Sequence, residues 1–123
     1  MRIYFVLILF TAALLAKDYT YFLPNDSKEL NQHIEKLIKN SKYDIDIAMY
    51  NFSYKKFAKL LNYSIKDGIN VNVIFDKNKI ETDKKSKYKY LKQKGANCFV
   101  SDKKMHLKIA LFDNKTAILG SLN

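Results

Sequence analysis

The run of residues 43–52 constrains the fold more than any other part of the sequence. It alternates through Ile45 and Ile47 and then becomes nearly all apolar, which is typical of a strand that enters a buried sheet. Apolar residues recur at helical spacing on either side of it, at 29–39 and again in a segment that follows Ser53. A buried strand between two amphipathic helices predicts an α/β domain.

The remaining segments continue this alternation of strand and helix. We expect Ser27 and Ser53 to cap the first two helices, and Gly68 to close the second in the left-handed conformation. A third helix is expected within the lysine-rich residues 77–94 and ends at Gly95. Strands are predicted at 19–23, 69–75, 96–100, 106–112 and 116–119, the last two joined by a tight turn at 113–115. Residues 17–123 therefore form one domain.

Residues 1–16 have the layout of a secretory signal. Arg2 is followed by an uncharged apolar run that ends just before Lys17. The run is short for a bilayer core, which needs about 20 residues, so a cleaved signal peptide is expected. Cleavage after Ala16 would place Leu14 where a small residue is preferred, so an N-terminal membrane anchor is the alternative. Both predict an exported bacterial protein, either periplasmic or anchored in the inner membrane and facing the periplasm.

The charge balance favours polyanionic partners, either nucleic acid or acidic lipid headgroups. The 123 residues include 22 Lys and Arg against 12 Asp and Glu, a net charge of +10. Eight lysines lie between Lys77 and Lys94, interleaved with Tyr88 and Tyr90. They form either a track for single-stranded nucleic acid or a solvated helix face. Tyr50, Phe52 and Phe57 are expected in the core, since they sit beside a buried strand.

The C-terminal strand pair carries a constellation of polar residues. His106, Lys108 and Asp113 stand in the spacing HxKxxxxD, and Gly120, Ser121 and Asn123 follow as GSxN. Because residues two apart in a strand share a face, we expect the side chains of His106 and Lys108 to project together. A neutral imidazole can attack phosphorus while an ammonium offsets charge on the non-bridging oxygens. Ser121 and Asn123 can donate further hydrogen bonds to those oxygens. The pattern predicts phosphodiester chemistry without a metal or another cofactor.

These two motifs resemble the signature of the phospholipase D superfamily at every position. Residues 45–53 and 68–73 also look like the family's small single-motif bacterial endonucleases, so the resemblance spans nearly all of residues 17–123. It implies a mixed β-sheet flanked by helices on both faces. It also implies that His106 is the nucleophile and that Lys108, Ser121 and Asn123 bind the substrate phosphate. Asp113 completes the candidate catalytic group, in which the resemblance gives it the role of holding local structure.

The family places two such motifs around one pocket, and this sequence has one. The other histidine, His33, lies on a predicted helix among polar residues and has no HxK context, so we expect a surface residue. The resemblance therefore implies a homodimer that shares one active site across a twofold axis. The family also continues past GSxN with a carboxylate that orients the histidine, so we expect a domain that is incomplete at the C-terminus.

The sequence thus predicts a non-specific endonuclease that cleaves DNA or RNA through a phosphohistidine. One alternative is a phospholipase D or cardiolipin-type lipid hydrolase, which the possible membrane association of residues 1–16 would suit. Another is a non-catalytic nucleic-acid-binding protein, which the lysine-rich helix would suit.

Overall fold

The computed structural model describes residues 16–121, which fall into two units, one up to Leu30 and one from Asn31 on. Nearly all of the expected signal segment, and Asn123, lie outside these residues. In the first unit the expected strand at 19–23 is wrong, because residues 16–22 have no regular structure. Tyr19 and Phe22 there are 63% and 72% exposed, so this segment lacks the burial that stabilises a strand. Within residues 16–121 we find no helix with the length and apolar character needed to cross a membrane.

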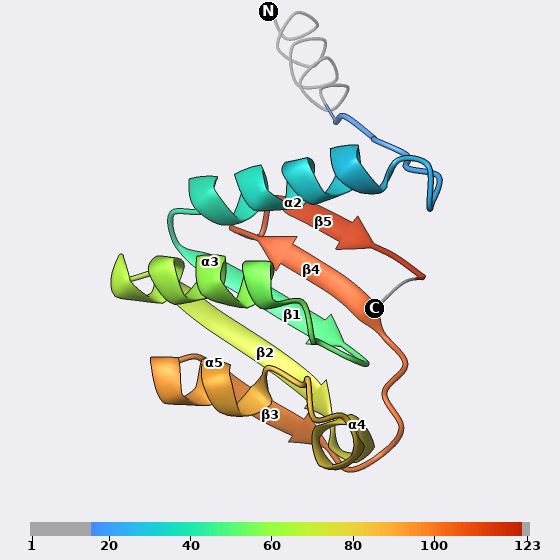
Figure 1. Cartoon of the computed structure of the whole chain (residues 1–123). Coiled ribbons are helices and arrows are strands. Elements are labelled where there is room, and N and C mark those ends of the chain that lie inside the picture. Colours follow the sequence, from blue (N-terminus) through green and yellow to red (C-terminus); the bar gives the residue numbers. More distant parts are fainter. Residues whose placement is uncertain (1–15, 122–123) are drawn as a thin grey trace, which may run out of the picture. The chain divides into compact units, whose positions relative to one another are not determined.

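The second unit is built on one mixed five-stranded sheet with the order β3-β2-β1-β4-β5 (Figure 1). β1, β2 and β3 are parallel, β4 pairs antiparallel with β1, and β5 pairs antiparallel with β4. The mixed sheet that the sequence predicts is therefore confirmed. The strands are β1 (Asp44–Met49), β2 (Asn70–Asp76), β3 (Asn97–Ser101), β4 (Lys108–Phe112) and β5 (Thr116–Leu119), and the helices are α2 (Ser27–Asn40), α3 (Lys55–Lys66), α4 (Lys77–Thr82) and α5 (Tyr88–Lys94).

The core lies between one face of the sheet and the helices. Alternate residues of β1 and β2 point into it, and α3 and α5, with the part of α2 from Asn31 on, cover it (Figure 1). Leu61 of α3 and Leu91 of α5 are fully buried there. Burial of a leucine side chain contributes about 2 kcal/mol, so these contacts fix both helices on the sheet. The buried apolar residues are Ile38, Ile45, Ile47, Phe52, Ala58, Leu61, Val71, Val73, Phe75, Leu91, Ala96 and Phe112.

The opposite face of the sheet differs from the expectation of helices on both faces. Among residues 31–121 this face carries polar side chains, exposed apolar ones and the half-buried Ala48, Ile109 and Leu111, and none of the residues buried in the core. The Asn72 amide donates to the Asp46 carboxylate at 2.7 Å, and the Asn97 amide donates to the side-chain oxygens of Asn70 and Asn72, both at 2.9 Å. Farther along the same strands, Ile74 and Phe99 are 40% and 56% exposed. A row of amides that satisfy one another does not need a covering helix.

Glycines end two helices as the sequence predicts. Gly68 has φ +83° and Gly95 has φ +100°, conformations that cost a glycine little. The start signals are less accurate. α3 begins after Tyr54 instead of Ser53, and the Ser27 hydroxyl donates to the Pro24 carbonyl at 2.6 Å. The helix expected within 77–94 is α5, which ends at Gly95 as predicted, and the sequence did not predict the separate helix α4.

The hairpin between β4 and β5 has the predicted tight turn. Asp113 and Asn114 have φ of 54° and 52°, and the Lys115 N–H donates to the Phe112 carbonyl at 3.0 Å. Two consecutive positive φ values define the type I′ turn, which asparagine and aspartate tolerate well.

The strand directions bring five chain segments to one edge of the sheet. β1, β2, β3 and β5 end at this edge and β4 begins there. The residues that follow Met49, Asp76, Ser101 and Leu119, and those that precede Lys108, therefore lie along the same edge, with the ends of β2, β1 and β4 at its centre. We call this the carboxyl edge, the side at which sheets of this kind bind ligands.

Candidate active site

His106 and Lys108 meet at the carboxyl edge. Lys108 is the first residue of β4, and His106 lies in the preceding loop, so the expectation that both belong to the strand is corrected. Regular pairing with β1 ends at Met49 opposite Lys108. The two side chains nevertheless come together, with Lys108 Nζ 3.3 Å from His106 Nδ1 and 3.4 Å from the His106 carbonyl oxygen.

The two residues differ sharply in solvent access. Lys108 is 8% exposed although it carries an ammonium, whereas His106 is exposed. A lysine held this deeply has few waters to screen its charge, so it interacts strongly with an anion that reaches it. The exposed imidazole is open to a substrate from solvent. One buried ammonium and one exposed imidazole are therefore adjacent.

Tyr50 completes this group and was not expected here. Its ring lies 4.5 Å from the His106 ring, and the ammonium groups of Lys79 and Lys108 lie 5.1 Å and 5.8 Å from its centroid.

The sequence placed Tyr50 in the core with Phe52 and Phe57, because an aromatic residue beside a buried strand is usually packed inside. Phe52 is buried as expected and Phe57 packs against the core, but β1 ends at Met49 and Tyr50 turns toward the site. No sequence signal marks Tyr50, because the end of β1 at Met49 is set by its pairing with β4.

Asp76 anchors the loop that carries His106. This carboxylate, 3% exposed at the end of β2, accepts hydrogen bonds from the backbone N–H of Met105 at 3.0 Å and of Lys79 at 3.2 Å. These bonds, the one from Met105 first, hold the pKa of the Asp76 carboxyl below its ordinary value. The residue before His106 is thereby fixed to the central sheet.

Asp113 lies at the other end of β4. It is five residues from Lys108, roughly 17 Å along a strand. Its carboxylate accepts hydrogen bonds from the backbone N–H groups of Lys42, Tyr43 and Asp44 at 2.8 to 3.2 Å. The structure thus places this signature residue at the entry to β1, away from the His106 imidazole.

The GSxN residues return to the carboxyl edge. The Gly120 N–H donates to the Lys108 carbonyl at 3.0 Å, which continues the pairing of β5 with β4. Ser121 follows as an exposed residue. The side chain of Asn123, the remaining candidate phosphate ligand, lies outside the described residues.

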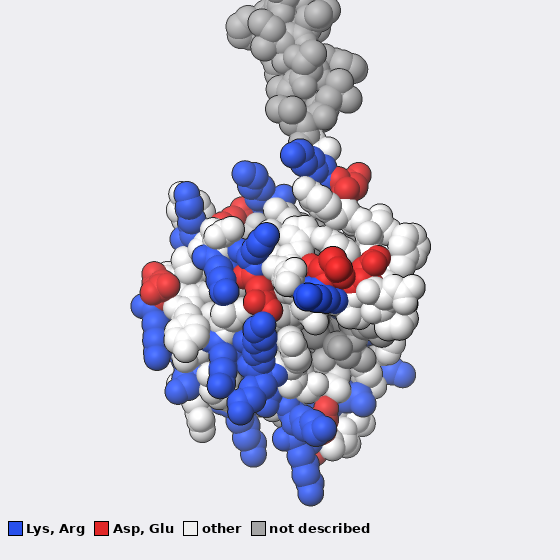
Figure 2. Space-filling view, turned by 45° about the horizontal axis from the view of Figure 1, so that its top comes forward, with Lys and Arg blue, Asp and Glu red and all other residues white. Residues whose placement is uncertain are grey.

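The other candidate residues lie elsewhere. His33 is on α2 and is half-buried rather than fully at the surface. Tyr88 and Tyr90 pack against the core, Tyr88 edge-on to Phe75 with 5.3 Å between ring centroids, so they do not form a track of exposed stacking rings. Lys92 and Lys94 lie over these rings, with 5.5 Å from Lys92 Nζ to the Tyr88 centroid and 5.6 Å from Lys94 Nζ to the Tyr90 centroid. Figure 2 shows many lysine side chains spread over one face of the molecule. In the described part of the chain no three His, Cys, Asp or Glu side chains are grouped to hold a metal.

Comparisons with known proteins show which family and fold this chain resembles. Residues 34–123 match the family described as cardiolipin synthase, PLD-like domain. No curated protein sequence matches. Among solved structures, NucT from Helicobacter pylori superposes with a TM-score of 0.74 at 26% identity, over 84% of this chain and 72% of that one.

Two further structures share the fold. Nuc from Salmonella typhimurium, titled a phospholipase D family member, gives a TM-score of 0.68 at 25% identity, over 76% of this chain and 63% of that one. TrmBL2, an archaeal chromatin protein described as having a novel mode of DNA binding, gives 0.53 at 16% identity, over 88% and 43%. At that identity the last match concerns the fold alone.

Proposed function

Because the chain belongs to the phospholipase D superfamily, we propose that it is a phosphodiesterase that cleaves DNA or RNA through a covalent intermediate on His106. The observation that carries this proposal is the contact of 3.3 Å between Lys108 Nζ and His106 Nδ1 at the open carboxyl edge. The resemblance to the family's small single-motif endonucleases favours nucleic acid as the substrate. The net charge of +10 suits nucleic acid and an acidic lipid surface alike.

In the proposed reaction a ring nitrogen of His106 attacks phosphorus and the bond from phosphorus to the leaving oxygen breaks. Lys108 offsets the charge that grows on the non-bridging oxygens. Water then attacks the phosphohistidine, which releases the phosphate product and restores the imidazole. His106 supplies the nucleophile and Lys108 the fixed cation, so we propose that the reaction is independent of metals.

The resting contact between the two side chains has a chemical consequence. An ammonium only donates hydrogen bonds, so Lys108 pairs with His106 Nδ1 when that nitrogen is an acceptor. A neutral ring then carries its proton on Nε2 and cannot attack through that atom. We infer that a bound phosphate draws the Lys108 ammonium to itself and frees Nδ1, so that the ring becomes competent for attack when the substrate arrives.

The remaining signature residues take supporting roles in this proposal. Ser121 and Asn123 bind the substrate phosphate, and Asp113 holds the start of β1 rather than entering the chemistry. A second His106, from another copy of the chain, protonates the leaving oxygen, so the active unit is a homodimer. We also propose export, on the basis of residues 1–16.

A cleavage assay with the full chain tests this function. Labelled DNA and RNA oligonucleotides are incubated in EDTA, and we expect cleavage to persist. His106→Ala should lower kcat by roughly 10³-fold or more, because it removes the nucleophile. A denaturing gel of the quenched reaction should show labelled phosphate on the protein in an acid-labile bond. His33→Ala is the matched control, and it should retain both cleavage and the labelled intermediate.

Two results would contradict the proposal. Full activity in His106→Ala would exclude the nucleophile, and loss of activity in EDTA with recovery on addition of a divalent cation would exclude the metal-independent route.

A second candidate function is hydrolysis of a phospholipid. The observation that favours it is the matched family description, which names cardiolipin synthase. Liposomes that contain an anionic phospholipid serve as a parallel substrate. If the protein hydrolyses the lipid and does not cleave nucleic acid, the substrate is a phospholipid and His106 acts on its phosphodiester.

A further inference from the structure

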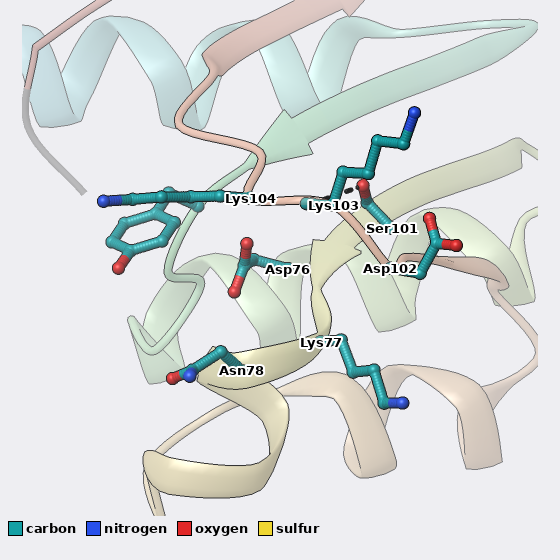
Figure 3. Close-up of a pocket in the computed structure, with 8 residues that line it drawn as sticks. Asp76, Lys77, Asn78, Ser101, Asp102, Lys103 and Lys104 are labelled. Carbon is teal, nitrogen blue, oxygen red and sulfur yellow. Dashed lines mark hydrogen bonds between the residues drawn. The ribbon is translucent and has the colours of Figure 1, made fainter.

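A pocket of about 350 Å³ lies beside the candidate active site at the carboxyl edge (Figure 3). It is formed where β2 and β3 end and where the loop toward His106 begins. Pockets that hold small ligands start at about 300 Å³, so this one has room for a group the size of a single nucleotide. Its lining residues are Tyr50, Asp76, Lys77, Asn78, Ser101, Asp102, Lys103 and Lys104.

Tyr50 belongs to both the pocket and the His106 site. This residue lines the pocket, and its ring also lies 4.5 Å from the ring of His106. A polymer whose phosphodiester is held at His106 and Lys108 would therefore reach the pocket with its next residue. A small diester without neighbouring residues would not.

The pocket lining carries three lysines and two carboxylates, those of Asp76 and the exposed Asp102, which leaves a net charge of +1. Figure 3 shows the side chains of Lys77, Lys103 and Lys104 extending from its rim in different directions. The Asp76 carboxylate inside is occupied by the backbone N–H groups of Met105 and Lys79. Dispersed ammonium groups suit a chain with several phosphates better than a single bound anion, since each lysine acts as a separate point charge.

We propose that this pocket is a subsite for the nucleotide next to the scissile phosphodiester, with Lys103 and Lys104 as contacts to its phosphate. The inference rests on the proposed nuclease function and extends it to substrate binding outside the reacting group. The loop of residues 102–105 then has two roles. Its backbone is held in place by the hydrogen bond from the Met105 N–H to Asp76, while the exposed side chains of Lys103 and Lys104 contact the substrate.

The test compares two substrates in the full chain. One is a 12-residue oligonucleotide and the other is bis(p-nitrophenyl) phosphate, a diester with no flanking nucleotide. For Lys103→Ala/Lys104→Ala we expect a KM for the oligonucleotide raised by roughly 10-fold, and a salt dependence of binding lowered by about two phosphate contacts. Turnover of bis(p-nitrophenyl) phosphate should stay within about twofold of the unsubstituted protein, because His106 and Lys108 are unchanged.

The control removes the same charge from the opposite edge of the sheet. Lys39→Ala/Lys115→Ala replaces two exposed lysines, one at the end of α2 and one in the turn between β4 and β5. An equal rise in KM in this control would overturn the subsite, because general charge would explain it. The subsite is also excluded if the pocket variant has an unchanged KM for the oligonucleotide, or if it loses the same fraction of activity on both substrates. If the unsubstituted protein cleaves bis(p-nitrophenyl) phosphate but no nucleic acid, the proposed nuclease function fails first, and the subsite with it.

Discussion

The Lys108 side chain is charged and almost completely buried. We therefore expect its substitution to affect catalysis and stability differently. We expect Lys108→Met, which keeps the length but removes the charge, to lower kcat by about 10²- to 10³-fold, as for loss of one group that stabilises transition-state charge. Stability should be unchanged or higher, because a buried ammonium carries a desolvation cost. Kinetics on the oligonucleotide and urea denaturation measure the two effects. A kcat in the Met variant equal to that of the unsubstituted protein would rule out the proposed role.

Asp113 is expected to show the opposite pattern. Asp113→Asn should leave turnover nearly unchanged and lower the urea midpoint, since its carboxylate accepts hydrogen bonds from three backbone N–H groups at the start of β1. These bonds, the one from Lys42 first, hold the pKa of the Asp113 carboxyl below its ordinary value. The stabilisation is therefore fully present above the unfolded pKa of about 3.9 and is lost as pH falls through the lower folded pKa.

The measurement for Asp113 is the urea midpoint from pH 7 to pH 2. The difference between Asp113→Asn and the unsubstituted protein should narrow as the pH falls below about 4. Asp67→Asn, which alters an exposed carboxylate at the end of α3, is the control and should track the unsubstituted protein. A large loss of kcat in Asp113→Asn with an unchanged midpoint would place Asp113 in the chemistry.

The residue types at the site were predictable from the sequence, but their surroundings were only partly so. His106 and Lys108 share a spacing of two, and the structure brings them together even though His106 precedes β4. Tyr50 was missed, because its position depends on where the pairing of β1 with β4 stops. No pattern within residues 43–52 marks that point, since it is set by a strand some sixty residues away.

At the scale of elements, the connection from α5 to β3 depends on the conformation of Gly95. Its φ of +100° ends α5 and turns the chain into β3. Gly95→Ala should lower the free energy of unfolding by about 1 to 2 kcal/mol, because a Cβ disfavours the left-handed region. The space is not the obstacle, since an added Cβ would lie 3.5 Å from Ile65 Cγ2, an ordinary contact.

The control for Gly95 is a residue that tolerates the same conformation. Gly95→Asn should cost less than Gly95→Ala, because asparagine adopts the left-handed region more readily. Thermal and urea denaturation of the three proteins give the order. Equal losses in the two variants would assign the effect to lost space instead of backbone strain.

Element types were predicted where a periodic pattern coincided with burial, as in β1, α3 and the hairpin of β4 and β5. The predictions were wrong or incomplete where the apolar pattern was short. Residues 19–23 read as a strand, yet Tyr19 and Phe22 are exposed and the segment is irregular. Within the lysine-rich residues 77–94 one helix was predicted, which is α5, and α4 was missed. Asp83 accepts a hydrogen bond from the Lys85 backbone N–H at 2.8 Å in the connection between the two helices. Such local competition for the backbone is weakly encoded in a hydrophobic pattern.

At the scale of the whole molecule, the strand order explains why distant segments supply one site. Strands β1, β2 and β3 run parallel and β4 runs back, so Tyr50, Asp76 and His106 meet although they lie far apart in the sequence. The α/β class and the mixed sheet followed from the sequence and its resemblance. Helices on both faces did not, because Asp46, Asn72 and Asn97 satisfy one another on the uncovered face. That pairing depends on the register of three strands, which no single segment reveals.

The proposed dimer makes the activity of each chain depend on its partner. If both His106 residues of a dimer serve one active site, a mixed dimer of intact and His106→Ala chains should be inactive. Equal amounts of the two chains, unfolded and refolded together, should then give about half the activity of the same amount of intact chain refolded alone, because about half of the intact chains are lost to mixed dimers.

The same mixing with His33→Ala chains controls for refolding itself. Those chains keep His106, so activity per intact His106 should not fall. If the activity of the intact chain does not change when His106→Ala chains are added at a wide range of ratios, each chain carries a complete active site. The proton for the leaving oxygen would then have to come from a group other than a second His106.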